Sequence, residues 1–86
     1  MKPIYFHADA YEHFIGWQEQ SPEIFEKIKV LIKDISRDAF KGLGKPEPLK
    51  HHYRGYWSRR ITSEHRIIYK FEGSTITIVS MKGHYI

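Results

Sequence analysis

The side chains of this chain that are best suited to chemistry lie in its second half. A carboxylate, Glu47, stands between two prolines, and an imidazole, His84, is followed by only two residues. Several lysines and arginines lie between them. A carboxylate can remove a proton, an imidazole can supply one, and fixed cations stabilise the charge that develops on a phosphate. This combination could cleave a phosphodiester, so it favours an enzyme that cuts RNA.

The stretch from residue 41 to residue 66 is strongly basic. It contains seven Lys and Arg residues but only two acidic residues, Glu47 and Glu64. The whole chain carries a formal net charge of +4 at pH 7. A local excess of positive charge suits a polyanionic partner such as a nucleic acid. Many small basic proteins share such a charge, so the stretch alone does not decide between RNA contact and an ordinary basic surface.

The first half of the chain predicts a short strand followed by two helices. An apolar run at Ile4–Phe6 predicts the strand, and Asp9 is a candidate N-cap for the first helix. Ser21 and Pro22 form a strong start for the second helix, as N-cap and first-turn proline. Apolar residues then recur with helical spacing at Ile24, Ile28, Leu31, Ile32 and Ile35. The polar face of this helix, which includes Asp34, is expected to be solvated.

The second half predicts a loop and then a sheet. Residues 38–48 are rich in Gly and Pro, which indicates a loop. The β-branched and aromatic segments 56–62, 65–71 and 74–81 are separated by short turns and predict an antiparallel meander. The coarse order is therefore β-α-α-β-β-β, an α+β domain. We expect the two N-terminal helices to pack on one face of an antiparallel sheet and to leave the opposite face free for a ligand.

Side-chain alternation on the strand 56–62 separates its two arginines, because neighbouring residues point to opposite faces. If residues 62–64 form a three-residue connection, Arg60 lies opposite Arg66 on the next strand. Two facing arginines repel each other by roughly 0.2–1 kcal/mol, which suggests that the sheet expects an anion between them. The alternative is that each arginine reaches a carboxylate such as Glu47 or Glu64.

Length and composition bound the class of protein. Eighty-six residues allow one domain, residues 1–86, and the absence of cysteine removes disulfides and thiolate metal sites. No apolar run approaches the ~18 residues of a membrane span, and the N-terminus lacks the apolar segment of a signal peptide. We therefore expect a cytoplasmic protein without membrane partners. The six histidines show no spacing typical of metal ligands, so neither a metal nor another cofactor is expected.

Several segments of the sequence resemble the YoeB/Txe family of bacterial toxins, within the RelE-like superfamily. The segments that carry the resemblance are Gly44 to His51, Trp57-Ser58-Arg59-Arg60-Ile61-Thr62, Glu64-His65-Arg66, His84-Tyr85, Trp17-Gln18-Glu19 and Leu31-Ile32-Lys33-Asp34. The resemblance implies a RelE-like microbial ribonuclease fold and a toxin of a type II toxin-antitoxin system. Such a toxin is an endoribonuclease that cuts mRNA in the A site of the 30S ribosomal subunit and so inhibits translation. The implied partners are mRNA on the ribosome, a YefM/Phd-like antitoxin and, in a homodimer, a second copy of the chain.

The resemblance also assigns roles to individual residues. By position, the family's general base falls on Glu47, its general acid on His84 and its central phosphate-binding role on Arg66. Further residues match the cations around the scissile phosphate and an aromatic residue near the leaving group or the base, namely Lys50, Arg60 and Tyr85. The reaction would need no metal. The chain departs from the family pattern in its Lys82-Gly83 pair, where an Arg and an aromatic residue are more usual, and in Ile86 after the tyrosine.

Two other classes of protein remain as alternatives. A non-catalytic RNA-binding or ribosome-binding protein would need only the basic stretch, so Glu47 and His84 would be dispensable. A toxin of the same fold could instead act by binding a protein, as ParE-like relatives do on DNA gyrase, although it would not need an acid and a base on one surface. Among the aromatic residues, Trp57 is expected in the core, whereas Tyr53 and Tyr56 are better candidates for stacking on bases.

Overall fold

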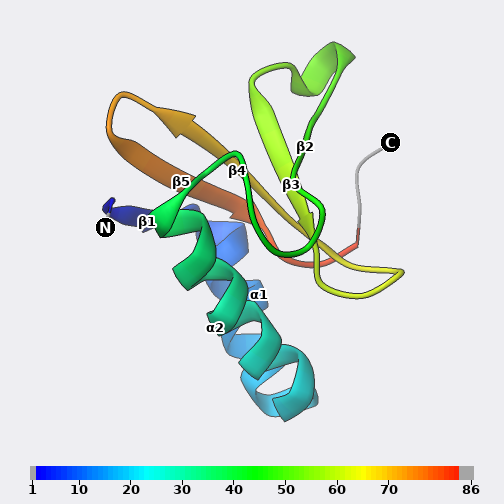
Figure 1. Cartoon of the computed structure of the whole chain (residues 1–86). Helices are drawn as coiled ribbons and strands as arrows, with labels where there is room; N and C mark the ends of the chain where they lie inside the picture. Colours follow the sequence, from blue (N-terminus) through cyan, green and yellow to red (C-terminus); the bar gives the residue numbers. More distant parts are fainter. Residues whose placement is uncertain (1, 84–86) are drawn as a thin grey trace.

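Two helices lie together on one side of a five-stranded sheet in the computed structural model, which describes residues 2–83 (Figure 1). The elements in chain order are β1 (Ile4–Phe6), α1 (Ala8–Gln20), α2 (Pro22–Arg37), β2 (Glu47–Pro48), the 3-10 helix η1 (His51–Tyr53), β3 (Tyr56–Arg60), β4 (Arg66–Glu72) and β5 (Thr75–Ser80). The strands lie side by side in the order β1-β5-β4-β3-β2. The predicted α+β class, with two helices on one face of a sheet, is confirmed. Neither helix in this part of the chain is long and apolar enough to cross a membrane.

The sheet is mixed, whereas the sequence predicted a wholly antiparallel one. Strands β2 to β5 pair antiparallel, but β1 runs parallel to β5. The parallel pairing joins the first strand of the chain to the last, although both long helices and three strands lie between them in the sequence. The short strand β2 lies inside the predicted loop and adds the other edge, with Glu47 opposite Ser58. Neither the pairing of β1 with β5 nor that of β2 with β3 could be predicted from the local sequence pattern.

The helix starts follow simple capping rules, with one correction. Ser21 caps α2, because its Oγ accepts a hydrogen bond of 3.3 Å from the backbone N–H of Ile24, and Pro22 is the first helical residue as predicted. The first helix begins two residues earlier than expected, because Asp9 was predicted as its N-cap. His7 is its N-cap, and its Nδ1 accepts a 3.4 Å hydrogen bond from the N–H of Asp9. Asp9 therefore lies in the first turn, where its charge is favourable to the helix dipole.

The hydrophobic core lies between the helices and one face of the sheet. Its buried members come from α1, α2, β4, β5 and the segments after α2, β3 and β5, and they are Ala10, Trp17, Ile28, Leu31, Ile35, Ala39, Ile61, Ile67, Tyr69, Ile76, Ile78 and Met81. Trp57 is only partly buried but packs against this core, and its ring lies 4.9 Å from that of Phe40. This packing agrees with the predicted structural role of Trp57.

The register of β3 and β4 is the one predicted from a three-residue turn. Arg60 lies directly opposite Arg66, and the N–H of Ile61 donates a 2.9 Å hydrogen bond to the carbonyl of His65. The Thr62 hydroxyl closes the turn, because it accepts hydrogen bonds from the backbone N–H groups of Glu64 and His65. Arg59 is buried and points toward the helices, whereas Arg60 is exposed on the opposite face. The sheet therefore presents a charged face away from its core.

Candidate active site

A polar hollow of about 180 Å³ lies on the open face of the sheet, where β2, β3 and β4 meet. The residues that line it are Lys45, Glu47, Leu49, Ser58, Arg60, Arg66 and Ile68. Three of the predicted site residues, Glu47, Arg60 and Arg66, are thus brought together. Pockets that hold a whole small molecule usually measure about 300–1,000 Å³, so this hollow suits one unit of a larger ligand.

Strand register explains why these side chains converge. Glu47 on β2 is paired with Ser58 on β3, which is paired with Ile68 on β4, and directly paired residues point to the same face. Arg60 and Arg66 form the pair that lies two residues further along the same two strands, so they point to this face as well. Two residues along a strand span only about 7 Å, which is well within the reach of an arginine. The carboxylate and the two guanidinium groups therefore share one small area of the sheet.

The guanidinium of Arg66 is oriented by the turn between β3 and β4. Its Nη1 donates a 2.8 Å hydrogen bond to the carbonyl of Thr62 and approaches the carbonyls of Ser63 at 3.4 Å and His65 at 3.3 Å. The hydrogen bonds described for this group all come from Nη1. Within residues 2–83 its other nitrogens donate no hydrogen bond, and the side chain lines the hollow, so Arg66 is suited to bind an anion there.

The charges of the hollow do not neutralise one another within residues 2–83. In that part of the chain neither Arg60 nor Arg66 forms an ion pair with a carboxylate, and Glu47 forms none with a cation. Glu64, the other expected acceptor, approaches His65 at 3.7 Å instead. The alternative in which each arginine forms an ion pair with a carboxylate such as Glu47 or Glu64 is therefore wrong for the described residues. A hollow with three cations and one carboxylate favours an anionic ligand.

A tight turn positions the segment that carries Glu47. Gly44 has φ +78° and Lys45 has φ +53°, and the Gly44 carbonyl accepts a 2.6 Å hydrogen bond from the N–H of Arg60. A Cβ atom at position 44 would lie only 2.9 Å from the backbone oxygen of Arg60. Glycine is thus required for the loop backbone to lie directly on β3. The residues that follow then enter the hollow from one side.

The remaining predicted site residues have different outcomes. Lys50 is exposed and precedes η1, where its carbonyl accepts a 3.1 Å hydrogen bond from Tyr53, and it does not line the hollow. Tyr53 and Tyr56 lie edge to face, with ring centroids 6.4 Å apart, and their stacking role stays a prediction. His84 and Tyr85 lie outside the described residues. Ser58 also lines the hollow and was not predicted as a site residue; it lies two residues before Arg60 on β3, so the two side chains share one face.

Three side chains hold the backbone that leads toward the C-terminus. The indole Nε1 of Trp17 donates a 2.8 Å hydrogen bond to the carbonyl of Met81, and His13 Nδ1 accepts one of 3.0 Å from the N–H of Met81. His65 Nδ1 accepts a 2.8 Å hydrogen bond from the N–H of Gly83, whose carbonyl is bonded by the N–H of Arg66 at 2.8 Å. Gly83 is therefore attached to the start of β4, beside the hollow.

Both histidines act as acceptors through Nδ1, which requires that this nitrogen carries no proton. Burial lowers the pKa of His13 below its usual value; the charge of Asp9 opposes this shift and that of Lys82 adds to it. This role of the two histidines was not predicted from the sequence, in which histidine spacing bears only on metal binding. No local signal identifies His13, because its partner is far away in the chain.

A metal centre has no obvious donor set here. Among residues 2–83, no group of three or more His, Cys, Asp or Glu side chains is arranged to hold a metal ion. The hollow itself offers one carboxylate among three cations. Hard cations such as Mg²⁺ and Ca²⁺ prefer several oxygen ligands, so the chemistry of this hollow suits an anion better.

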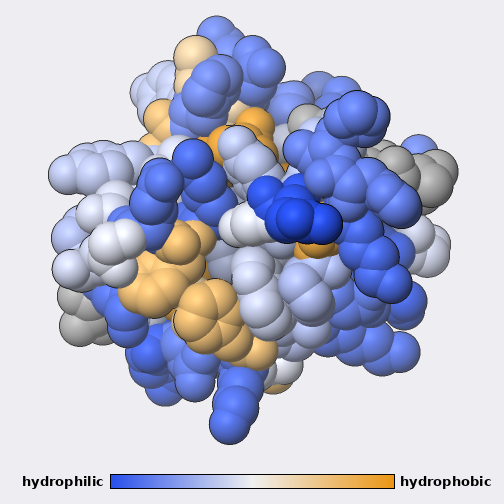
Figure 2. All heavy atoms as spheres, turned by 90° about the horizontal axis from the view of Figure 1, so that it is seen from above, coloured by the Kyte–Doolittle hydropathy of each residue, from blue (hydrophilic) through white to orange (hydrophobic). Residues whose placement is uncertain are grey.

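An apolar groove of about 360 Å³ adjoins the hollow and shares Lys45 and Arg60 with it. Its apolar lining comes from α2 and the following loop, where Val30 is 54% and Leu43 52% exposed. Figure 2 shows the molecule from above, where hydrophilic residues cover most of the surface and hydrophobic residues appear in a few smaller groups between them. The surface around the hollow thus combines positive charge with accessible apolar area.

Comparison with known proteins finds similarity over almost the whole chain. The family model described as YoeB-like toxin of bacterial type II toxin-antitoxin system matches residues 6–85. Toxin YoeB of Escherichia coli strain K12 is 46% identical over 77 residues, which cover 90% of this chain and 92% of that protein. Among solved structures, a YoeB/ParE toxin from Agrobacterium tumefaciens has a TM-score of 0.93 at 40% identity, covering 96% of this chain and 99% of that chain.

Two structures from Staphylococcus aureus show assemblies of related toxins. The YoeB-YefM complex matches with a TM-score of 0.88 and 41% identity, covering 99% of both chains. A YoeB dimer matches with a TM-score of 0.89 and 41% identity, covering 98% of both chains. These relatives share the fold and a large part of the sequence of the present chain.

Proposed function

This chain belongs to the YoeB-like toxins of bacterial type II toxin-antitoxin systems, and we propose that it is an endoribonuclease that cleaves mRNA in the ribosomal A site and so inhibits translation. The observation that carries the proposal is the hollow on the open face of the sheet. There the carboxylate of Glu47 shares a small area with Arg60 and Arg66, and none of the three is neutralised within residues 2–83. A base beside two cations is what cleavage of a phosphodiester requires.

In the proposed reaction, the RNA supplies its own nucleophile. Glu47 removes the proton of a 2′-hydroxyl, and the resulting oxygen attacks the adjacent phosphorus. The bond from phosphorus to the 5′-oxygen breaks, and His84 donates a proton to that oxygen. The products are a 2′,3′-cyclic phosphate and a 5′-hydroxyl. Arg60 and Arg66 stabilise the extra negative charge on the phosphate oxygens, so the reaction is proposed to need no metal.

Two further residues are proposed to act around this centre. Lys50 is exposed outside the hollow, so it is suited to the phosphate of a neighbouring nucleotide rather than to the scissile one. Tyr85 is proposed to lie near the leaving group or the base. The small size of the hollow supports a substrate that is held elsewhere, because it offers room for one unit of a polymer. The ribosome would supply the remaining contacts to the mRNA.

The test is primer extension on a defined mRNA in a purified translation system, with and without ribosomes. Glu47→Gln should slow cleavage by about 10²–10⁴, the usual contribution of a proton-transfer group. Arg66→Ala should weaken both cleavage and binding, because the same charge serves both. Glu72→Gln is the matched control, since Glu72 is an exposed carboxylate at the far end of β4, and it should leave cleavage unchanged.

The outcome also separates the proposal from its alternatives. New RNA ends that require ribosomes and are lost in Glu47→Gln would support the nuclease. Inhibition of translation without new RNA ends would instead indicate a non-catalytic ribosome-binding protein. Binding to a protein target without any effect on RNA would indicate a toxin of the ParE-like kind.

We further propose a YefM/Phd-like antitoxin as the partner that neutralises this toxin. The related toxin from Staphylococcus aureus was solved as a YoeB-YefM complex. The hollow and the adjoining groove offer positive charge next to exposed Val30 and Leu43, which suits an acidic segment with apolar side chains. A site of action on the ribosome implies a cytoplasmic location. A homodimer is proposed by similarity to the solved YoeB dimer, and sedimentation of the purified protein would test it.

A further inference from the structure

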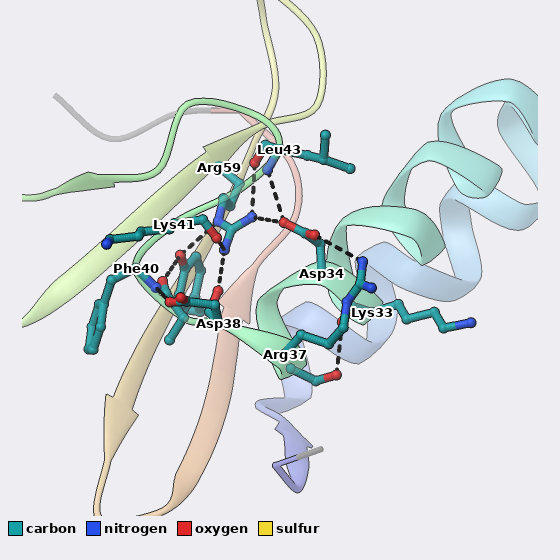
Figure 3. A network of polar contacts seen from close by, with 11 residues as sticks. Lys33, Asp34, Arg37, Asp38, Phe40, Lys41, Leu43 and Arg59 are labelled. Atoms are coloured by element: carbon teal, nitrogen blue, oxygen red, sulfur yellow. Dashed lines mark hydrogen bonds and ion pairs between the residues drawn. The ribbon is translucent and has the colours of Figure 1, made fainter.

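A buried arginine lies directly behind the candidate active site. Arg59 stands between two residues that line the hollow, Ser58 and Arg60, but its side chain points to the opposite face and is fully buried. A guanidinium has five N–H donors. Each nitrogen of Arg59 is engaged, and the five acceptors are the Tyr69 hydroxyl at 3.0 Å, Asp34 Oδ2 at 2.7 Å and the carbonyls of Leu43 at 2.9 Å, Asp38 at 2.6 Å and Lys41 at 3.1 Å (Figure 3).

Most of these acceptors belong to one irregular segment, residues 38–43, which connects α2 to the glycine turn. This segment has no helix or strand of its own, so its carbonyls need other donors. Arg59 supplies them, and the Tyr69 hydroxyl adds a 2.6 Å hydrogen bond to the carbonyl of Ala39. The segment therefore wraps around the guanidinium, as Figure 3 shows for Asp38, Lys41 and Leu43.

Asp34 completes the arrangement from α2. Its Oδ2 accepts hydrogen bonds from Arg59 Nη1 and from the backbone N–H of Leu43 at 2.9 Å. The prediction that Asp34 lies on a solvated helix face is wrong, because its side chain is only 14% exposed. The N–H of Leu43 and the guanidinium of Arg59 hold the pKa of this carboxyl below its usual value. Asp34 thus ties the end of the segment to both the helix and β3.

The segment continues directly into the candidate active site. After Leu43, the carbonyl of Gly44 binds the N–H of Arg60, and Lys45 and Glu47 then line the hollow. We propose that Asp34 and Arg59 are positioning residues of the reaction. By holding residues 38–43 against the back of β3, they set the place of Glu47 relative to Arg60 on the front. This inference rests on the proposed function, in which Glu47 is the base.

The choice of arginine follows from the geometry. A lysine at position 59 would keep the charge but would offer three donors from a single nitrogen, so it could not serve carbonyls on several sides. Loss of the carboxylate of Asp34 would leave the buried guanidinium without its countercharge. Either change should loosen residues 38–43 and let Glu47 move, while the side chains of the hollow stay chemically intact.

The test uses Asp34→Asn in the full chain, with Arg37→Ala as the matched control. Arg37 also contacts Asp34, at 3.3 Å, but its side chain is 67% exposed and does not bind residues 38–43. Ribosome-dependent cleavage is measured together with hydrogen exchange of two amides, the N–H of Leu43 and that of Arg60. A displacement of about 1 Å can cost on the order of 10²-fold in rate. We expect Asp34→Asn to lower kcat by about 10- to 100-fold with little change in KM, and to speed exchange at both amides.

Three results would decide against the inference. Unchanged exchange at both amides would show that the pair does not hold the segment, and unchanged kcat despite faster exchange would show that the segment does not position Glu47. An equal effect of Arg37→Ala would point to charge alone. If Asp34→Asn fails to fold, Tyr69→Phe removes one hydroxyl from the same network and should give a smaller change of the same kind. If the wild type does not cleave RNA, the proposed function fails, whereas the exchange measurement still decides whether the pair holds the segment.

Discussion

Replacing Gly44 by alanine should destabilise this protein far more than replacing Gly73. Both glycines have positive φ, +78° and +63°, so an alanine at either position bears a left-handed conformation that costs roughly 1–2 kcal/mol. Their surroundings differ. A Cβ at Gly73 meets nothing within 4 Å, whereas one at Gly44 lies 2.9 Å from the oxygen of Arg60, 3.0 Å from Leu31 Cδ2 and 3.2 Å from the nitrogen of Arg60. Backbone atoms of a central strand cannot easily move away.

The clash at Gly44 adds to the conformational cost. Overpacking typically costs about 1–3 kcal/mol, and weakening the 2.6 Å hydrogen bond from Arg60 costs about 0.5–1.5 kcal/mol more. The expected loss is therefore roughly 3–6 kcal/mol for Gly44→Ala against about 1–2 kcal/mol for Gly73→Ala. Each kcal/mol lowers Tm by about 4–8 °C in a domain of this size.

Thermal and urea unfolding followed by circular dichroism would measure both variants. Gly44→Ala should lower Tm by more than about 12 °C, and its urea midpoint should fall without a change in slope. It should also reduce cleavage, because the turn positions Glu47. Equal losses of stability in the two variants would refute the reasoning, since they would show that conformational strain alone matters and that the loop does not pack on β3.

Two further predictions concern the contacts that hold the C-terminal backbone. Trp17→Phe removes the donor to the Met81 carbonyl. It should lower the free energy of unfolding, measured in urea, by about 1–3 kcal/mol, because a buried acceptor loses its partner. A loss of less than about 0.5 kcal/mol would contradict this prediction. The pKa of His13 is lower in the folded protein than in the unfolded chain, so the unfolded chain binds more protons. The contribution of His13 to the free energy of unfolding is therefore fully present above its pKa in the unfolded chain, and it is lost as pH falls through its pKa in the folded protein. His13→Asn, whose amide oxygen can replace Nδ1 as acceptor, should flatten this dependence in urea titrations between pH 5 and 8, and parallel curves for the two proteins would contradict it.

Much of the site was accessible from the sequence because it depends on short-range rules. Capping by Ser21 and Pro22 involves neighbours within one helical turn, and it was predicted correctly. The opposition of Arg60 and Arg66 followed from the length of one turn and the alternation of side chains. The family resemblance is also confirmed, by a family model that spans residues 6–85. The roles of Glu47, Arg66 and His84 in catalysis stay predictions.

Other features depend on contacts between residues far apart in the chain. The sequence indicated an antiparallel sheet, but the place of β1 beside β5 was decided by the path of the chain across both helices. Lys50 follows Glu47 closely in sequence, yet it lies just before η1 and does not line the hollow, whereas its neighbour Leu49 does. The amphipathic pattern of α2 predicted that Asp34 faces solvent. That pattern describes one helix by itself, so it does not include the loop that packs against Asp34 in the folded protein.

The amino-acid sequence by itself determined the two long helices, four of the strands, the register of β3 with β4 and the identity of the reactive side chains. Only the tertiary structure decided how these side chains are supported. Arg59 reaches Asp34 across 25 positions of the chain, and Met81 reaches His13 across 68. Propensities, caps and turn lengths act over a few residues, whereas a buried guanidinium finds its acceptors only after helices, loop and sheet have packed together and excluded water.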